Sequence, residues 1–443
     1  MKRDRPNILQ ITTHDSGRHF GCYGHPTLHT PNIDALASDG IRFDQYFCAV
    51  PICSASRACM LTGLYPQSNG LLDLTAFGWR IRDDVPHMSV LLKRAGYRTA
   101  LFGVQHEVLE PQLGRLAFDE VHTCRRAREA AEDVAEFLDR AGTDAPFYAQ
   151  IGFLETHTPF LRDDMQPDTE RGVEIPPYLA DTPAARTTMA GYQRAVRDAD
   201  AGVGRILDAL RCGGWEENTL VVFTTDHGIE VPRAKWYLYD PGIAIAMVLR
   251  HPAGGLVGGR VCDLLLSNVD YLPTIFELAG VDIPTHAEGR SFADRLLQCD
   301  PAPTREFIHG MYHKNQTRCV RSRRYKQIRH FSDATDFHRL PVICEEVLNK
   351  KVIDRIELFD LEEDPNEFVN VANHPKYADI RRRLDTELWC WMESVDDPLL
   401  KGPVRSPSYD RAIADYADWR AARPDAVESG LDGEAPTRPP GRT

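Results

Sequence analysis

Short apolar runs alternate with longer segments of mixed polarity up to about residue 303. The runs are rich in β-branched residues and have the length of buried parallel strands, while the longer segments repeat apolar residues at helical spacing. This alternation predicts an α/β fold, a large and mostly parallel sheet with helices on both faces. The predicted strands cover residues 7–13, 41–47, 97–103, 147–153, 220–225 and 243–249, and the predicted helices residues 31–40, 53–63, 88–95, 125–140, 182–213 and 270–279.

The pattern changes in the last third of the chain. Residues 318–321, 325–330 and 356–361 predict short strands of an antiparallel sheet, and apolar positions at helical spacing from Tyr377 to Trp391 predict a helix packed on it. We therefore predict three parts: an α/β domain of residues 1–303, a smaller C-terminal α+β subdomain of residues 304–397, and an extended or partly disordered tail of residues 398–443.

The tail carries one apolar stripe before a stretch that is predicted to be disordered after about residue 423. Tyr409, Ile413, Tyr416 and Trp419 recur at helical spacing. The tail is either a frayed end or an arm that docks on a neighbouring subunit, and the aromatic residues favour docking. Homo-oligomerisation through this tail is therefore a hypothesis.

Composition narrows the choice of partners and compartment. The 443 residues are 42% hydrophobic and 26% charged, as in ordinary globular proteins, and the net charge of −13 argues against nucleic acid as a partner. The eleven cysteines show no regular spacing, which suits a reducing compartment. No apolar signal segment precedes the first strand and no stretch is long enough to cross a membrane, so we expect a cytoplasmic protein without a membrane partner.

Polar residues follow four of the predicted strands directly or within a few positions. His14 and Asp15 follow the strand of residues 7–13. His106 follows the strand of residues 97–103, and His157 follows that of residues 147–153. The pair Asp226 and His227 follows the strand of residues 220–225. The carboxyl ends of parallel strands form the edge where ligands bind in open α/β sheets, so these side chains are expected to converge on one crevice. Asp15, Asp226 and His227 could hold one divalent cation; alternatively, Asp15 caps a helix and the other pair forms an ordinary turn.

A second candidate is the start of the helix at Cys53. Unpaired backbone N–H groups and the positive end of the helix dipole collect there, which favours an anion. Arg57 lies one turn further on, so its guanidinium can face the same side. The alternative is a buried structural cysteine next to a surface arginine.

The segment from Cys53 to Arg57, with the Leu-Thr-Gly that ends at Gly63, resembles the signature of the formylglycine-dependent sulfatases of the alkaline phosphatase superfamily. In that family a maturation enzyme oxidises the cysteine to formylglycine, and the hydrated aldehyde is the nucleophile. The resemblance implies an alkaline-phosphatase-like fold and hydrolysis of a sulfate ester or sulfamate with release of inorganic sulfate. Ala55 stands where the signature has proline, as in some family members.

The resemblance also implies a divalent cation, which is Ca²⁺ in most family members and contacts the formylglycine oxygen at position 53. Asp15, Asp226 and His227 match residues that hold it. His14 stands where the family has its first aspartate. With His14 and His227 as nitrogen ligands, Mn²⁺ or Zn²⁺ would fit better than usual; alternatively, His14 is not a ligand.

Further matches imply catalytic roles. Arg57 would stabilise the ionised hydroxyl of the nucleophile, Lys235 would contact the sulfate oxygens, and His157, in a His-X-Pro motif, is the candidate general acid. His106 would orient or deprotonate the second hydroxyl of the hydrate. Val104 replaces the lysine of the family's Gly-Lys-X-His motif, so either Arg80 or Arg82 compensates or the substrate differs from a simple sulfate ester.

Three hypotheses for function follow. The first is hydrolysis of a small sulfated molecule, a sugar or aryl sulfate or sulfamate, and four segments resemble sulfamate-cleaving members of the family, at residues 182–186, 200–204, 239–242 and 364–367. The second is a phosphodiester or phosphonate monoester hydrolase on the same fold. The third is a non-catalytic binding homologue. A basic run on the predicted small sheet is either a solvated strand face or the lining of a substrate entrance; it comprises Arg321, Arg323, Arg324, Lys326 and Arg329.

Overall fold

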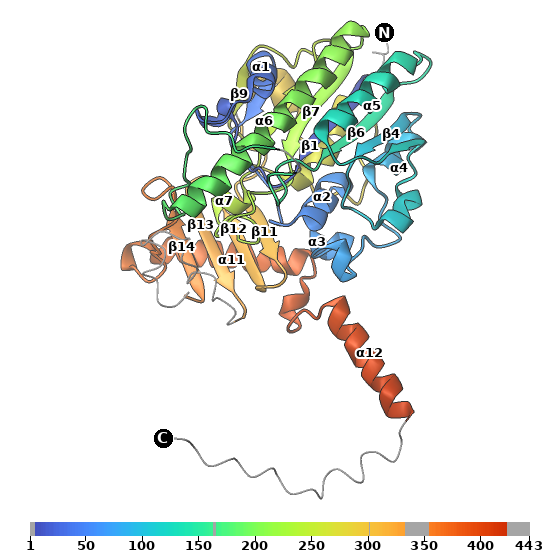
Figure 1. The fold of residues 1–443 in the computed structure, drawn as a ribbon. Coiled ribbons are helices and arrows are strands. Elements are labelled where there is room, and N and C mark those ends of the chain that lie inside the picture. Colours follow the sequence, from blue (N-terminus) through green and yellow to red (C-terminus); the bar gives the residue numbers. More distant parts are fainter. Residues whose placement is uncertain (1–4, 163–164, 301, 333–353, 423–443) are drawn as a thin grey trace, which may run out of the picture.

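The computed structural model describes residues 5–162, 165–300, 302–332 and 354–422 (Figure 1). Its larger sheet has the strand order β5–β4–β6–β1–β7–β8–β2–β9. β8 runs antiparallel to both neighbours, and the other neighbouring pairs are parallel. The mostly parallel sheet is thus confirmed. Its strands are β1 (Asn7–Thr13), β2 (Ile41–Phe43), β4 (Arg98–Gly103), β5 (Glu120–His122), β6 (Phe147–Phe153), β7 (Thr219–Thr225), β8 (Met247–Arg250) and β9 (Arg260–Cys262).

Helices cover both faces because successive side chains of a buried strand point to opposite sides. In β1, Ile8 packs into one hydrophobic core, whereas Leu9 and Ile11 pack into another. The first core is closed by α2 (Cys53–Thr62), α4 (Met88–Arg94), α8 (Tyr271–Leu278) and α9 (Ala293–Gln298), and the second by α1 (Pro31–Asp39), α5 (Ala127–Arg140) and α6 (Pro183–Cys212).

The long helix α6 shows how the sequence sets its own ends. Pro183 occupies the first turn, where its missing N–H costs nothing, and the Thr182 hydroxyl accepts a hydrogen bond from the Ala185 N–H. The helix ends before Gly213, and its apolar face packs against α5. α5 and α6 lie side by side over the sheet in Figure 1.

The smaller sheet is antiparallel, with the order β11–β12–β13–β14, and α11 packs on it. This confirms the predicted second sheet with its helix. The domain boundaries at residues 303 and 397 stay predictions. The elements are β11 (Ile308–Tyr312), β12 (Thr317–Arg321), β13 (Tyr325–His330), β14 (Ile356–Asp360) and α11 (Ala378–Ser394).

Short elements complete the described chain. α3 (Pro66–Asn69) and α7 (Asp240–Ile243) are single turns, and β3 (Tyr46–Phe47) pairs in parallel with β10 (Leu266–Ser267). Short 3₁₀ turns lie at Gly21–Tyr23, Thr75–Phe77, Glu110–Leu116, Asn268–Asp270, Pro375–Tyr377 and Pro398–Leu400.

Two predicted strands differ from the structure. The strand predicted over residues 41–47 is two strands, β2 and β3, because the chain leaves the large sheet at Asp44 and pairs with β10 instead. The strand predicted over residues 243–249 begins only at Met247, because Ile243 closes the α7 turn. The sequence pattern also missed β11, whose five residues pair with β12.

The interpretation of the basic run as a solvated strand face was wrong. Lys326 is fully buried between Asp240 and Glu367, and Arg321 is buried against Asp240 with two hydrogen bonds. Buried cations need paired anions, and α7 and the loop after β14 supply them. Arg324 and Arg329 also form ion pairs, and Arg323 remains exposed. The run therefore mainly joins the small sheet to the large domain.

The tail begins with a helix, α12 (Pro407–Ala421), that projects from the body of the molecule (Figure 1). Its predicted stripe is exposed at Tyr409, Ile413, Tyr416 and Trp419. The disorder predicted after about residue 423 lies outside the described residues. In the part of the chain that is described, no helix combines the length and apolar character that crossing a membrane requires.

Candidate active site

Cys53 is the first residue of α2, and the whole helix is buried. The preceding Ile52 is extended and offers no side-chain cap, so the first N–H groups of the helix face the carboxyl edge of the sheet without that cap. Gly63 ends the helix in the left-handed conformation, as the sequence predicted. The Ser56 hydroxyl donates to the carbonyl of Asp226 and so ties the helix start to the end of β7.

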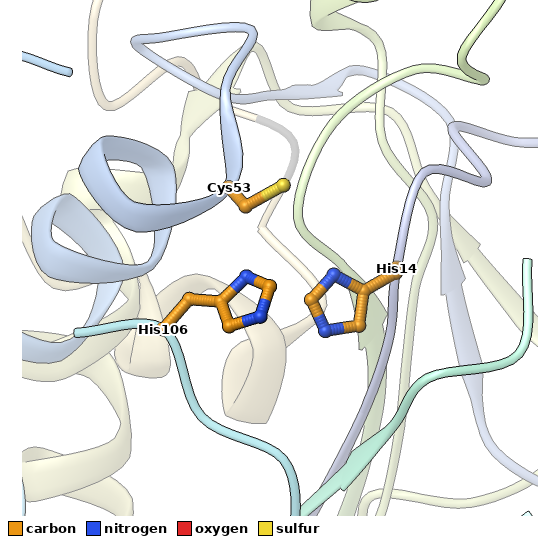
Figure 2. Close-up of side chains that lie close together, drawn as sticks. All are labelled: His14, Cys53 and His106. Atoms are coloured by element: carbon orange, nitrogen blue, oxygen red, sulfur yellow. The ribbon is translucent and has the colours of Figure 1, made fainter. Parts of the chain in front are cut away.

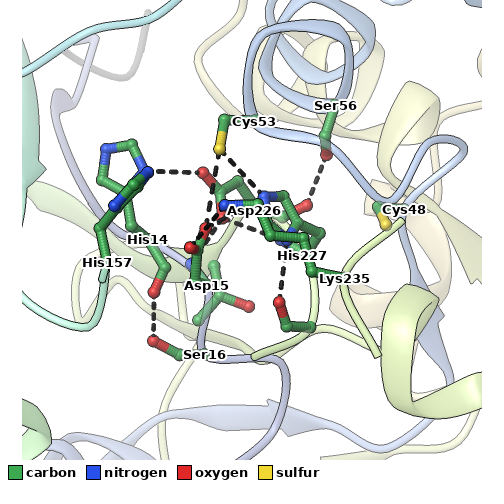
Figure 3. A network of polar contacts seen from close by, with 12 residues as sticks. His14, Asp15, Ser16, Cys48, Cys53, Ser56, His157, Asp226, His227 and Lys235 are labelled. Carbon is green, nitrogen blue, oxygen red and sulfur yellow. Dashed lines mark hydrogen bonds and ion pairs between the residues drawn. The ribbon is translucent and has the colours of Figure 1, made fainter. Parts of the chain in front are cut away.

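Two carboxylates lie directly beneath the cysteine (Figure 3). The Cys53 Sγ atom lies 3.6 Å from Oδ1 of Asp15 and 3.1 Å from Nε2 of His227. Oδ1 of Asp226 accepts hydrogen bonds of 2.9 Å from the backbone N–H groups of Asp15 and His227. β1 and β7 are neighbours in the sheet, which is why residues from their two ends meet.

Two cations balance this acidic pair. Arg57 donates through Nε to Oδ2 of Asp226 over 3.1 Å, and Nζ of Lys235 lies 2.8 Å from Oδ2 of Asp15. The Arg57 side chain is fully buried, so the sequence alternative of a surface arginine was wrong. Lys235 also contacts Oε2 of Glu230 at 2.9 Å.

Three imidazoles gather around Cys53. The ring centroid of His14 lies 4.6 Å from that of His106 and 5.7 Å from that of His157. Figure 2 shows His14 and His106 pointing toward each other below the cysteine. The His157 Nδ1 atom contacts the Thr158 carbonyl at 2.7 Å, which fixes a proton there and leaves Nε2 free for a substrate.

Burial sets the charge of these groups. It lowers the pKa of His14 well below its ordinary value and, together with Arg57, lowers the pKa of His106 to about 3. It also lowers the pKa of His227 to about 4 and that of His157. All four imidazoles are therefore neutral near pH 7 and able to accept a proton or bind a cation.

The two aspartates differ in their environments. Burial raises the pKa of Asp15 well above its usual range, against the opposing effect of Lys235. Burial acts in the same direction on Asp226, but His227, Arg57 and the backbone donors lower its pKa to about 2. Burial and the Asp15 charge raise the pKa of the Cys53 thiol well above normal.

The residues present fit a divalent cation. His14, Asp15, Cys53 and Asp226 each offer one ligand atom, and these atoms lie within 4.8 Å of one another. Neither nitrogen of His14 has a hydrogen-bond partner among the described residues, although the ring is fully buried. The His227 Nδ1 atom contacts the Gly228 carbonyl at 2.9 Å, which fixes the ring proton there and turns Nε2 toward Cys53 Sγ and Asp15 Oδ1, in the manner of metal-binding histidines.

The sequence missed two acidic residues at this site. Glu230 pairs with Lys235, accepts a hydrogen bond from Thr158 and lies 3.9 Å from the His157 ring, between Asp226 and Lys235 in the chain. Glu107 is fully buried, and its Oε2 accepts a hydrogen bond from the His106 N–H. Their positions next to matched motif residues were the available signal.

The two arginines suggested as substitutes for the missing lysine lie in exposed ion pairs instead. Arg80 pairs with Asp83, and Arg82 pairs with Asp84. Their side chains are more than half exposed. All the predicted site residues otherwise meet at the carboxyl edge of the sheet, namely His14, Asp15, Cys53, Arg57, His106, His157, Asp226, His227 and Lys235.

Comparison with known proteins gives this arrangement a family. Residues 6–281 match the family model described as Sulfatase, and residues 233–394 match the model described as N-sulphoglucosamine sulphohydrolase, C-terminal. The fold and the family match together define a sulfuric ester hydrolase. The chain belongs to the sulfatase family, as the resemblance of the Cys53 segment predicted.

Two curated relatives span nearly the same length. The chain is 28% identical over 473 residues to N-sulphoglucosamine sulphohydrolase of Homo sapiens, covering 90% of this chain and 93% of that protein. It is 27% identical over 443 residues to an ulvan-active sulfatase of Formosa agariphila, covering 91% of this chain and 83% of that protein.

Solved structures confirm the fold. One, determined in complex with its substrate D-glucosamine-2-N,6-O-disulfate, has a TM-score of 0.71 and 20% identity, covering 89% of this chain and 99% of that one. Another, the phosphonate monoester hydrolase of Agrobacterium radiobacter, has a TM-score of 0.70 and 19% identity, covering 88% of this chain and 96% of that one.

Proposed function

We propose that this sulfatase hydrolyses the sulfate ester or sulfamate of a small sugar through a formylglycine derived from Cys53, with one divalent cation, and releases inorganic sulfate. The observation that carries the proposal is the place of Cys53. Its sulfur lies 3.1 Å from Nε2 of His227 and 3.6 Å from Oδ1 of Asp15, at the start of a helix. An oxidised side chain there would meet both the cation ligands and the helix dipole.

The modified residue and the cation would supply different parts of the reaction. When Cys53 is oxidised, the hydrated aldehyde supplies a hydroxyl nucleophile and a second hydroxyl through which sulfate can be expelled. A cation held by His14, Asp15, Asp226 and His227 would supply Lewis-acid stabilisation of negative charge. Ca²⁺ is the family's usual ion, and the imidazole nitrogens make Mn²⁺ or Zn²⁺ suitable as well.

The chain's own side chains bind and orient the sulfate. Lys235 lies at the edge of the acidic cluster, and burial opposes its charge while Cys53, Asp15 and Glu230 raise its pKa above the ordinary value. It therefore stays protonated and can neutralise a sulfate oxygen. Arg57, which is held by Asp226, adds a second fixed positive charge beside position 53.

Two histidines are suited to proton transfer. Burial and Arg57 lower the pKa of His106 to about 3, so its ring is neutral and can orient the second hydroxyl; the charge of a bound sulfate would raise its pKa and favour uptake of the hydroxyl proton. His157 presents a free Nε2, and an anionic sulfate bound beside it would favour the protonated ring. The protonated His157 can then donate to the departing alcohol or amine.

Sugar N-sulfates are the substrate class we favour. The C-terminal match to N-sulphoglucosamine sulphohydrolase and the 28% identity to the human protein of that name support this choice. A maturation enzyme that generates formylglycine is the protein partner that this function requires. The cytoplasmic location and the homo-oligomer stay predictions.

A phosphodiester or phosphonate monoester hydrolase is the second candidate. Val104 replaces a sulfate-binding lysine, and one structure of the same fold is a phosphonate monoester hydrolase. The binding homologue ranks last, because the predicted catalytic and ligand residues are present and adjacent.

The test begins with peptide mass spectrometry across Cys53, to measure the fraction converted to the aldehyde. The converted protein is then assayed in parallel with glucosamine N-sulfate, an aryl sulfate and an aryl phosphonate ester. Cys53→Ala should abolish sulfate release, while Cys212→Ala, which changes an exposed cysteine, should not. Turnover by Cys53→Ala at the parent rate would refute the proposal, and faster phosphonate turnover would favour the second candidate.

A further inference from the structure

When Cys53 is not oxidised, the side chains around it offer a sulfur ligand, which the formylglycine form of the site lacks. His14, Cys53 and His106 each offer one ligand atom, and the three atoms lie within 4.8 Å of one another (Figure 2). They come from the end of β1, the start of α2 and the loop after β4. Three separate elements therefore hold a sulfur and two imidazole nitrogens around a common point.

The unpartnered ring of His14, which also supports the cation site described above, points to a missing ligand here as well. Its ring is fully buried, and neither Nδ1 nor Nε2 has a hydrogen-bond partner in the described structure. Nδ1 lies 3.3 Å from Oδ2 of Asp226, but without the geometry of a hydrogen bond. Buried polar nitrogens are normally satisfied, and leaving one without a partner destabilises the folded state.

A fourth donor lies beside two of the three, His14 and Cys53. His14 and Cys53 also lie within 4.8 Å of carboxylate oxygens of Asp15 and Asp226. A thiolate, two imidazoles and a carboxylate make a ligand set that Zn²⁺ takes in tetrahedral geometry. Ca²⁺ takes oxygen ligands instead, so sulfur at position 53 changes the preferred ion.

We propose that the folded chain with an unoxidised Cys53 binds one Zn²⁺ through Cys53 Sγ, His14 and His106, with a carboxylate of Asp15 or Asp226 as the fourth ligand. On binding, the Zn–S bond forms, the thiol proton leaves to solvent and no atom changes oxidation state. Conversion to formylglycine removes the sulfur and so removes this site. Chains that fold before conversion would therefore be held as a zinc protein without sulfatase activity.

The probe is Co²⁺, which reports its ligands by colour. Protein made without the maturation enzyme, and shown by mass spectrometry to keep Cys53, is titrated with Co²⁺ and then with Zn²⁺. We expect one equivalent of Co²⁺ to give a thiolate-to-cobalt charge-transfer band and tetrahedral ligand-field bands, which Zn²⁺ removes by displacement. Cys53→Ser should abolish the charge-transfer band, and His106→Ala should weaken Zn²⁺ binding by more than about tenfold.

Matched controls keep the result interpretable. Cys212→Ser and His286→Ala change an exposed cysteine and an exposed histidine, and both should bind as the parent does. Circular dichroism of every variant verifies folding. The proposal is overturned if the parent binds Co²⁺ without the charge-transfer band, if it binds no Co²⁺, or if a folded His106→Ala keeps the parent affinity.

This site does not depend on the proposed function. If converted protein releases sulfate while unconverted protein binds no Zn²⁺, the zinc proposal alone fails. If unconverted protein shows the thiolate band while converted protein turns over no sulfate, the proposed function alone fails.

Discussion

The ammonium group of Lys235 lies 2.8 Å from Oδ2 of Asp15, although the two residues are 220 positions apart in the chain. Both side chains are almost wholly buried. The contact places a fixed positive charge beside Asp15, which follows the end of β1. Removing Lys235 would leave the Asp15 carboxylate buried without its cation, whereas removing Asp15 would leave Lys235 paired with Glu230 alone.

Lys235→Met is therefore expected to lower kcat/KM for sulfate release by about 10²–10³-fold, the usual cost of removing one fixed donor to a developing anion. The measurement is steady-state kinetics on fully converted protein. Lys401→Met, which changes an exposed lysine paired with Asp396, should leave kcat/KM unchanged. Parent-like kinetics of Lys235→Met would remove Lys235 from the mechanism.

Glu230 should contribute to stability in a pH-dependent way. Burial opposes its ionisation, but Lys235 and Thr158 lower its pKa to about 2. Because the folded-state pKa is depressed, the stabilisation is present above about pH 4.3, the ordinary Glu value, and is lost as pH falls through 2. Glu230→Gln should lower the free energy of unfolding at pH 7 by about 1–3 kcal/mol.

Urea unfolding of the parent and Glu230→Gln at several pH values checks this expectation. The difference between the two should narrow as pH falls from 5 toward 2. Glu363→Gln, at an exposed position, should stay within about 0.5 kcal/mol of the parent. A difference that stays constant, or widens, at low pH would contradict the assigned Lys235–Glu230 interaction.

Ala55→Pro should raise the fraction of Cys53 that is converted to formylglycine. Ala55 is the third residue of α2, where proline is tolerated because the N–H of the first turn has no partner within the helix. The substitution restores the residue that the family signature has at this position. Peptide mass spectrometry after co-expression with a maturation enzyme measures the converted fraction, and an unchanged or smaller fraction would refute the expectation.

Arg318 and Asp397 should tie the small sheet to the segment after α11. Both side chains are buried, and the guanidinium donates through Nε and Nη2 to the two carboxylate oxygens. Asp397→Ala leaves a buried unpaired cation and should cost about 3–5 kcal/mol of unfolding free energy. Thermal and urea unfolding measure the loss.

The neighbouring Asp396 provides the matched control for this pair. Its side chain is exposed and pairs with Lys401, and Asn also tolerates its left-handed backbone conformation, so Asp396→Asn should change stability by less than about 1 kcal/mol. Equal effects of the two substitutions would show that the buried pair does not stabilise the protein.

Much of the fold follows from local patterns. The strand Asn7–Thr13 and the strand Phe147–Phe153 have the predicted bounds, because a run of buried β-branched and aromatic residues is sufficient to mark a central strand. The single strand predicted over residues 41–47 was wrong, because the sequence pattern does not show that the chain changes its pairing partner at Asp44. β11 was missed because its pairing with β12 carries no clear alternating pattern.

In the candidate site, too, the sequence identified some of the residues and only the structure revealed others. His14, Cys53, His106 and Asp226 could be identified as chemistry-bearing residues, since each stands at a predicted strand end or helix start. Glu230 could not, because its role comes from contact with Lys235 and Thr158 rather than from a motif. The basic run was misread for a related reason: the burial of Lys326 depends on Asp240 and Glu367, which lie far away in sequence.

The sequence by itself determined the strand and helix pattern, the family resemblance and the identity of the candidate ligand residues, because these depend on residue type and spacing along one segment. The tertiary structure alone decided which charges are paired, which imidazoles lack a partner and how near Cys53 lies to Asp15 and His227. Those properties depend on distances between segments and on exclusion of water, and both arise only when the strand ends come together in the folded sheet.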